Sequence, residues 1–268
     1  MKIAYFDCSS GIAGNMILGA LINAGLKPKY LKSELSKLGV RNWKLEIIKT
    51  KRQGIQGTHV EVKIKGKEKP RRLNEILTII KKSKLSKNVK NLSSRIFQRL
   101  AEAESKVHGE PVGYVHLHEV GAIDAMLDII GTAIGIEKLG IQKVYCSPLP
   151  HGRGSIKHKH GILPNPAPAT VELLKGIPTY GTNIKGELVT PTGAAIISTL
   201  AKGFGDLPRM EVKDIGYGAG SLNLSIPNLL RLFVGEAQLP SEKDAILQIE
   251  TNLDDMHPKH FNKVIAAL

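Results

Sequence analysis

The segment HLHEVGAIDAMLDIIG, residues 116–131, changes from the pattern of a strand to the pattern of a buried helix. His116 and His118 alternate with apolar residues, so both imidazoles would point to one face of a strand. After Gly121 the apolar side chains follow helical spacing, and we expect a helix over residues 122–138. Apolar side chains cover most of its circumference, which is typical of a helix in the protein interior.

The remaining strip of this helix is narrow, and it holds Asp124, Asp128, Gly131 and Gly135. The aspartates should therefore face a ligand or another part of the protein, and the glycines would let a neighbouring element approach closely. Two carboxylates one turn apart repel each other by roughly 0.2–0.5 kcal/mol, so a cation or a basic partner would stabilise them. A solvated polar face is the alternative for the histidines and for the aspartates, but together they favour an ion or ligand site.

The composition is that of a soluble globular protein from a reducing compartment. The chain has 268 residues, of which 42% are hydrophobic, and no apolar run approaches the ~20 residues that span a bilayer. Asp7 comes too early for a signal peptide. Two cysteines, Cys8 and Cys146, imply no disulfide framework. We therefore expect a cytoplasmic protein that is not associated with a membrane.

The net charge of +14 is concentrated in one part of the chain. Residues 27–106 hold 23 Lys and Arg against 7 Glu, whereas the remaining residues hold 15 basic and 17 acidic side chains. Nucleic-acid binding is one interpretation of such an excess. However, the basic residues are spread over several predicted elements that offer no aromatic platform for base stacking. This favours a lysine-rich solvated surface.

The order of predicted strands and helices indicates an α+β or mixed α/β fold, with one large domain over residues 1–240. Residues 241–268 should begin a second domain that the chain does not complete, because an apolar stripe from Phe261 to Leu268 has no later element to cover it. The expected strands are 2–6, 43–50, 59–65, 143–147, 210–215, 228–234 and 245–250. The expected helices are 16–24, 31–38, 73–82, 92–107, 122–138 and 169–174, with others that open at Pro191 and near residue 254.

Two segments have the composition of a helix start that binds an anion. Residues 7–15 link the first strand to a helix, and the backbone N–H groups at that point would attract an anion. A tight turn without a ligand is the alternative. Thr190 precedes Pro191 where another helix opens, so its side chain would cap that helix, and the same geometry would bind a phosphate.

Two further segments combine glycines with polar residues or prolines. Residues 150–170 contain three histidines, Arg153 and several prolines, and we expect a long, rigid, irregular loop that carries function. Gly216, Gly218 and Gly220 lie between two predicted strands. They would either admit a ligand close to the backbone or form a bulged turn.

Taken in order, these segments resemble the LarC-type nickel-insertion proteins over residues 3 to about 256. Each piece is weak alone, but five in register are specific. The chain departs from the family pattern at Asn15, where many members have Asp, and it ends soon after residues 250–256, which resemble the opening of a C-terminal nucleotide-using domain. The matching pieces are Asp7–Met16, His116–Asp124, His160–Thr170, Thr190–Gly193, and Gly216–Gly220 with Pro227, Asn228 and Arg231.

The resemblance implies an enzyme, a nickel chelatase of the lyase class. It would insert nickel into a pyridinium mononucleotide that bears two thiocarboxylates and so complete a nickel-pincer cofactor. The family reaction depends on CTP with a divalent cation, which would bind outside this chain, so the chain alone is expected to lack the nucleotide-dependent step.

The expected partners are the small anionic precursor, the nickel-pincer-dependent enzyme that receives the cofactor, and either a second copy of the chain or a separate C-terminal chain. Nucleic acid is not an expected partner. A non-catalytic metal carrier or a basic nucleic-acid-binding regulatory module is the alternative function.

Nickel accepts imidazole, carboxylate and thiolate ligands, and a precursor with a phosphate and two thioacid groups is strongly anionic. Cys8 and Cys146 would supply thiolate only if they are not, as is more usual, buried hydrophobic side chains. The expected metal ligands, which should converge on one cleft, are Asp7, His116, His118, Glu119, Asp124, Asp128 and His160. The expected precursor-binding residues are Ser9, Gly11, Gly14, Arg153, Thr190, Thr192, Gly193, Gly218 and Gly220.

Overall fold

The computed structural model describes residues 1–66, 71–115, 117, 122–158, 161–238 and 265. Residues 1–238 form one compact unit, and residues 239–268 are divided from it as a second unit. The expected strand 245–250, the helix expected from residue 254 and the apolar stripe lie outside the described residues, apart from Ile265. The second domain therefore stays a prediction.

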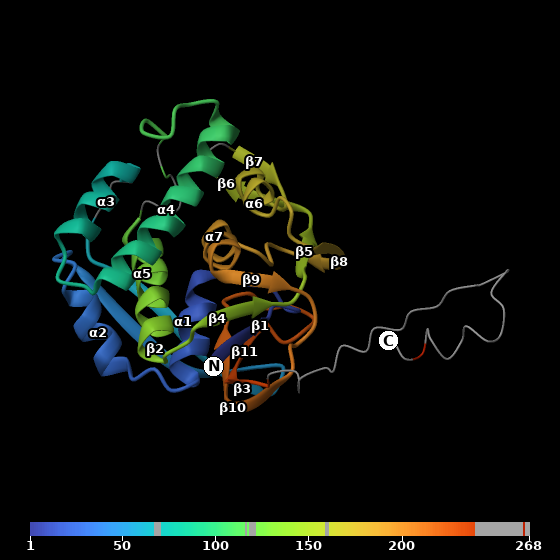
Figure 1. The fold of residues 1–268 in the computed structure, drawn as a ribbon. Helices are drawn as coiled ribbons and strands as arrows, with labels where there is room; N and C mark the ends of the chain where they lie inside the picture. Colours follow the sequence, from blue (N-terminus) through green and yellow to red (C-terminus); the bar gives the residue numbers. More distant parts are fainter. Residues whose placement is uncertain (67–70, 116, 118–121, 159–160, 239–264, 266–268) are drawn as a thin grey trace. The chain divides into compact units, whose positions relative to one another are not determined.

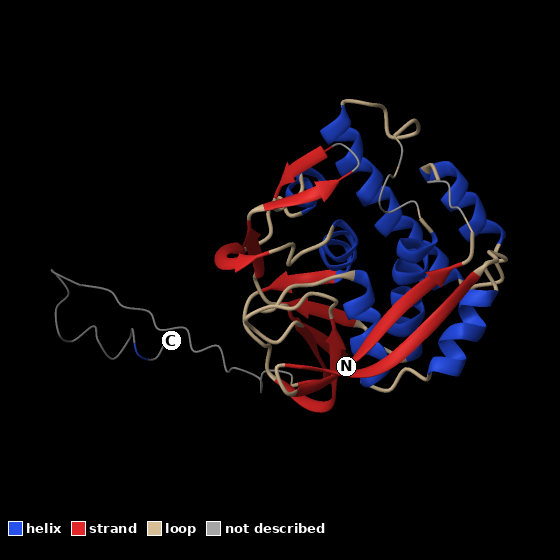
Figure 2. Cartoon of the chain, turned by 180° about the vertical axis from the view of Figure 1, so that it is seen from behind, coloured by secondary structure: helices blue, strands red, loops and turns tan. Residues whose placement is uncertain are grey.

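A seven-stranded mixed sheet forms the centre of residues 1–238 (Figures 1 and 2). Its strand β1 lies between β11, to which it is antiparallel, and β4, to which it is parallel. The apolar run of β1 explains this central position, because Ile3, Ala4, Tyr5 and Phe6 are all buried. The mixed α/β fold expected from the sequence is confirmed. In spatial order the strands are β2 (Trp43–Arg52), β3 (Ile55–Ile64), β10 (Met210–Ala219), β11 (Leu229–Ala237), β1 (Lys2–Asp7), β4 (Lys143–Cys146) and β9 (Ala201–Phe204).

The helices build layers on this sheet (Figure 1). Helix α1 lies against β3 and β10, α5 packs on α1, and α4 packs on α5, while α7 contacts α4 and β4. In the described part of the chain, no helix is long and apolar enough to cross a membrane. The helices are α1 (Gly14–Asn23), α2 (Pro28–Ser36), α3 (Leu73–Lys82), α4 (Lys87–His108), α5 (Ile123–Lys138), α6 (Pro168–Leu173) and α7 (Pro191–Leu200).

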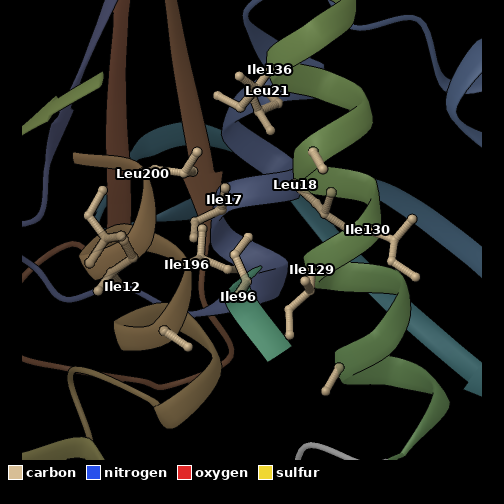
Figure 3. Close-up of a cluster of buried hydrophobic side chains, with 14 of the residues drawn as sticks. Ile12, Ile17, Leu18, Leu21, Ile96, Ile129, Ile130, Ile136, Ile196 and Leu200 are labelled. Carbon is tan, nitrogen blue, oxygen red and sulfur yellow. The ribbon is translucent and has the colours of Figure 1, made fainter. Parts of the chain in front are cut away.

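Helix α5 lies in the interior, as its sequence predicts. Ile123, Leu127 and Ile130 are 5%, 1% and 0% exposed. Figure 3 shows Ile129 and Ile130 of α5 among side chains from α1, α4 and α7. Burial on several sides follows from the nearly complete apolar circumference of this helix.

The narrow strip of α5 faces α1, and its glycines set the distance between the two helices. A Cβ added at Gly131 would lie 2.9 Å from the Leu18 side chain, and one added at Gly135 would lie 2.8 Å from Leu21. Such contacts are tighter than real Cβ atoms make, so a larger residue at either position would push the Leu18 or Leu21 side chain aside. The sequence predicted that a neighbouring element would approach Gly131 and Gly135 closely, and that element is α1.

The glycines after Met210 have the same function on the other side of α1. Gly216 and Gly218 lie within β10, and not in a turn between strands as expected. A Cβ at either position would overlap the backbone carbonyl of Ala20 or Met16. The close approach that these glycines allow is therefore made by α1, which lies directly on the strand.

The prediction of a long irregular loop for residues 150–170 is wrong, because short strands occupy most of this segment. Strand β5 (Leu149–Arg153) pairs in parallel with β8 (Thr179–Lys185), and β6 (Ser155–His158) forms a hairpin with β7 (Gly161–Pro164). The prolines concealed these strands. They are tolerated because a strand pair at the edge of a structure does not need every N–H for hydrogen bonding.

The hairpin of β2 and β3 is longer than the sequence predicted. The sequence predicted a connection of residues 51–57, but in the structure only Gln53 and Gly54 connect the two strands, with φ values of 46° and 81°. Two central residues with positive φ form the tight turn that matches the twist of a hairpin. The strands therefore extend to Arg52 and from Ile55, and the hairpin tip reaches the segment that follows β10.

Candidate functional site

A pocket of about 460 Å³ lies where three helices begin beside strand β3. The N-termini of α1 and α7 and the first two turns of α5 contribute to its wall, and these three helices contact one another (Figure 1). The N-terminus of a helix carries a partial positive charge and unpaired N–H groups. The polar residues of the wall are Asn15, His59, Glu61, Asp124, Asp128, Glu187, Thr190, Thr192 and Ser221.

The side chain of Asp128, a residue of α5, lies against the start of α1. Gly14 packs against its carboxyl group so closely that an added Cβ would lie 2.5 Å from Oδ2. Oδ1 is buried and has no hydrogen-bond partner among the described residues. Burial, and secondarily the nearby charge of Asp124, raise the pKa of Asp128 well above its usual range. The charged form of this group is therefore destabilised unless a cation comes near it.

Asp124 is the exposed member of the pair. Its Oδ1 accepts a hydrogen bond of 2.8 Å from the backbone N–H of Ala125. A carboxylate in the first turn of a helix is stabilised by the helix dipole. The two aspartates of the predicted strip thus line one pocket in different environments, Asp124 exposed and Asp128 half-buried.

Thr190 caps α7, as its position before Pro191 predicts. Its Oγ1 accepts a hydrogen bond of 3.1 Å from Gly193 N. A Cβ at Gly193 would lie 2.5 Å from the Ile12 carbonyl oxygen, and Thr190 N donates to that oxygen at 3.1 Å. The loop before α1 and the loop before α7 are therefore packed backbone to backbone, which brings the two helix starts together.

Gly11 belongs to the same contact. A Cβ there would overlap the Leu188 carbonyl oxygen, and the next residue, Ile12, donates from its N–H to that oxygen at 2.7 Å. Gly11 and Gly193, two of the glycines predicted to bind the precursor, thus allow the loops before α1 and α7 to pack against each other. Of this group, Gly14 is part of the wall itself.

Asp7 does not line this pocket. It accepts hydrogen bonds from the backbone N–H of Ser9 at 3.1 Å and from the Ser9 hydroxyl at 2.6 Å, and it forms an ion pair with Arg231. Burial raises the pKa of Asp7, but the Ser9 hydrogen bonds and the Arg231 charge outweigh this effect and hold the pKa below its ordinary value. Ser9 and Arg231 line a separate pocket of about 250 Å³.

The other predicted residues divide into two groups. Arg153 is exposed at the end of β5, and Gly218 and Gly220 pack against Met16 and Asn228 rather than lining the 460 Å³ pocket. The remaining predicted ligands lie outside the described residues, so their roles stay predictions. They are His116, His118, Glu119 and His160.

The structure also brings in residues that the sequence did not single out. Strand β3 contributes His59 and Glu61, two residues apart and hence on the same face. The Nδ1 atom of His59 lies 2.9 Å from the Ala219 carbonyl oxygen. Polar and apolar residues alternate in this strand, which predicts a strand but does not distinguish a ligand from a solvated side chain.

Cys8 and Cys146 are fully buried, with their sulfur atoms 3.4 Å apart. Burial and the neighbouring Cys146 raise the pKa of the Cys8 thiol well above its usual range. Neither cysteine lines the pocket of Asp124 and Asp128. This environment favours buried thiols over thiolate ligands.

The donors of the pocket are spread around its wall and do not form a compact metal centre. Within the described ranges, no group of three or more His, Cys, Asp or Glu side chains is close enough to hold a metal ion. The arrangement suits an ion that shares its coordination with a second ligand. The three helix N-termini suit an anionic second ligand.

One family model and several known relatives of this chain agree in their descriptions. The family model described as nickel insertion protein matches residues 4–268. A putative nickel insertion protein of Dictyoglomus thermophilum is 47% identical over 268 residues, which are 100% of this chain and 69% of the relative. A putative nickel insertion protein of Geotalea daltonii is 48% identical over 262 residues, 97% of this chain and 67% of the relative.

A third relative carries a more specific name. The pyridinium-3,5-bisthiocarboxylic acid mononucleotide nickel insertion protein of Desulfitobacterium hafniense is 46% identical over 274 aligned positions, which cover 100% of this chain and 68% of the relative. No solved structure matches the chain. A family match over nearly all residues, with relatives of this similarity, shows that the chain belongs to the nickel insertion protein family.

Proposed function

We propose that this chain inserts nickel into a pyridinium bisthiocarboxylate mononucleotide, and that nickel and precursor meet in the 460 Å³ pocket. The observation that carries the proposal is the presence of three helix N-termini and four carboxylates in one cavity. Helix N-termini attract an anion and carboxylates attract a cation. The Desulfitobacterium hafniense relative is named for insertion of nickel into such a mononucleotide.

The positive helix N-termini and the negative carboxylates of the pocket would bind different substrates. The starts of α1 and α7, at Gly14 and Thr192, would bind the phosphate or another anionic group of the precursor. Asp124 and Asp128 would offer oxygen ligands to the nickel ion. The sulfur atoms of the precursor supply the softer ligands, so a protein site with few ligands leaves coordination positions open for them.

The finer parts of the family reaction belong to the same proposal. CTP with a divalent cation would bind outside residues 1–240, in a second domain that residues 241–268 begin or that another chain provides. His116, His118, Glu119 and His160 would complete the nickel ligands. A nickel-pincer-dependent enzyme would receive the finished cofactor.

The experiment compares Asp124→Ala with Asp206→Ala, a control in an exposed turn that does not line the pocket. Nickel affinity is measured by calorimetry, with and without precursor. We expect Asp124→Ala to weaken nickel binding on the order of tenfold with little loss of stability, and the control to bind normally. Normal binding by both variants would remove the pocket from the proposal. Nickel binding without any conversion of precursor by the chain together with its nucleotide-using domain would favour a metal carrier.

A further inference from the structure

The ring of His59 is fixed by a hydrogen bond that determines its tautomer. A carbonyl oxygen accepts hydrogen bonds and has no proton to give, so Nδ1 of His59 must donate its N–H to Ala219 across the 2.9 Å between them. In the neutral imidazole the other nitrogen, Nε2, then carries the lone pair. This nitrogen makes no hydrogen bond with any described residue, and His59 is one of the residues that line the pocket.

The carbonyl that accepts this hydrogen bond is itself held in place. Ala219 pairs with Leu229 in the ladder of β10 and β11. The next carbonyl, of Gly220, accepts from Nε and Nη2 of Arg52 at 3.0 and 2.7 Å. The tip of the β2–β3 hairpin therefore fixes the strand end against which the imidazole is oriented.

We propose that Nε2 of His59 is a nitrogen ligand for the nickel ion in this pocket. The inference rests on the proposed function and assigns a residue to it. Imidazoles that bind metals usually donate their second N–H to a carbonyl or carboxylate, which fixes the ring and the tautomer. His59 has this arrangement before any ion arrives. It lines the same cavity as Asp124 and Asp128, but these three side chains are not close enough together to hold an ion by themselves, so the precursor would supply the remaining ligands.

A nitrogen ligand also explains how the pocket would choose among divalent ions. A site with carboxylate oxygens alone suits Mg²⁺ and Ca²⁺, whereas an imidazole shifts the preference toward Ni²⁺ and its neighbours in the series. The imidazole of His59 should therefore contribute more to the discrimination between nickel and magnesium than to the affinity for divalent ions in general.

The test uses the full chain with His59→Asn as the main variant. The side-chain amide of Asn can donate to the Ala219 carbonyl from about the position of Nδ1, but it has no counterpart of Nε2. His59→Ala is the second variant, and His108→Ala in α4 is the matched histidine control outside the pocket. Ni²⁺ and Mg²⁺ affinities are measured by calorimetry, and folding is checked by thermal melting.

We expect both His59 variants to bind Ni²⁺ at least about tenfold more weakly, with Mg²⁺ affinity unchanged, and the His108 control to bind as the original chain does. Nickel X-ray absorption should show one imidazole fewer per ion in His59→Asn. Ring ¹⁵N spectra of the original chain should show a protonated Nδ1 and an Nε2 resonance that shifts when Zn²⁺ is added as a diamagnetic substitute.

The outcomes separate this inference from the proposed function. Normal Ni²⁺ affinity in both His59 variants, together with weak binding in Asp124→Ala, would overturn the role of His59 and leave the pocket in place. Normal affinity in the His59 and Asp124 variants alike would overturn both. Loss of Ni²⁺ and Mg²⁺ binding together in a folded His59→Asn protein would contradict a role in selecting nickel.

Discussion

The carboxyl group of Asp128 lies against Gly14, and its Oδ1 atom is buried with no hydrogen-bond partner among the described residues. Asp7 is the opposite case, because Ser9 and Arg231 surround its carboxylate with donors. The pKa of Asp128 is raised and that of Asp7 is lowered. Two acids of one fold therefore have opposite effects on how stability depends on pH.

Asp128→Asn should stabilise the chain at neutral pH. A raised pKa in the folded state means that the folded protein binds the proton more tightly than the unfolded chain. The carboxyl group therefore costs nothing below the unfolded pKa, and it destabilises the fold increasingly as pH rises toward the folded pKa. The cost is about 1.4 kcal/mol per unit of pKa shift. Denaturant unfolding at pH 4 and pH 8 measures it, with Asp206→Asn as control, and an equal effect of the mutation at both pH values would contradict the prediction.

Asp7→Asn should destabilise the chain at neutral pH, by roughly 1–3 kcal/mol. The lowered pKa means that the ionised carboxylate is favoured in the folded state. Its contribution is complete above the unfolded pKa and is lost as pH falls through the folded pKa. The same unfolding series measures this, and the difference from the original chain should disappear at the acidic end.

Among the elements, α1 is closely packed on two sides, since it is in contact with strand β10 on one side and helix α5 on the other. Gly216 and Gly218 remove side chains from β10, and Gly131 and Gly135 remove them from α5. The sequence predicted the second contact from the narrow strip of α5. It did not predict the first, because glycines inside a strand and glycines in a turn look alike without the partner that packs on them.

Gly218→Ala should therefore destabilise the fold severely, by roughly 1–3 kcal/mol or more, because its methyl group would overlap the Met16 carbonyl oxygen. Gly181→Ala in β8 is the matched control, since an added Cβ there meets no atom within 4 Å. Thermal and denaturant unfolding compare the two variants. Equal stability would mean that α1 can shift away from β10 at little cost.

Leu127→Ala should cost about 2–5 kcal/mol, as is usual for a large side chain removed from a packed core. Leu127 is 1% exposed in the middle of α5. Val171→Ala in α6 is the control, because Val171 is 49% exposed and should change stability little. The free energy of unfolding of the two variants tests whether the nearly apolar helix is indeed the centre of the core.

For the whole molecule, the sequence predicted the fold class and the interior helix because periodicity reports burial directly. It missed the strands of residues 149–164, where prolines outweighed a weak strand pattern. It singled out Asp124, Asp128 and Thr190 from local patterns, and Gly14 and Thr192 as helix starts suited to the anionic precursor that the resemblance implies. The fold brings all five to one pocket. It missed His59, because what distinguishes that histidine is a hydrogen bond to Ala219, which is 160 residues away in the chain.

A chain cut after Gln238 should keep a cooperative unfolding transition and the nickel affinity of the 268-residue chain. The described residues of the pocket all belong to the compact unit of residues 1–238. Calorimetry with Ni²⁺ and thermal melting of the two chains measure this. A lower melting temperature with weaker nickel binding would show that residues 239–268 contribute to the site.

The glycine contacts on both sides of α1 also limit how the pocket can respond to its contents. A helix that touches backbone on one side, with glycine opposite its side chains on the other, cannot slide along its axis without collision, so the first turn stays at a fixed depth in the cavity. The part of the pocket wall that α1 forms is therefore rigid. Any widening that admits a bulky ligand, or any narrowing around a small one, would then come from other parts of the wall, such as the hairpin of β2 and β3.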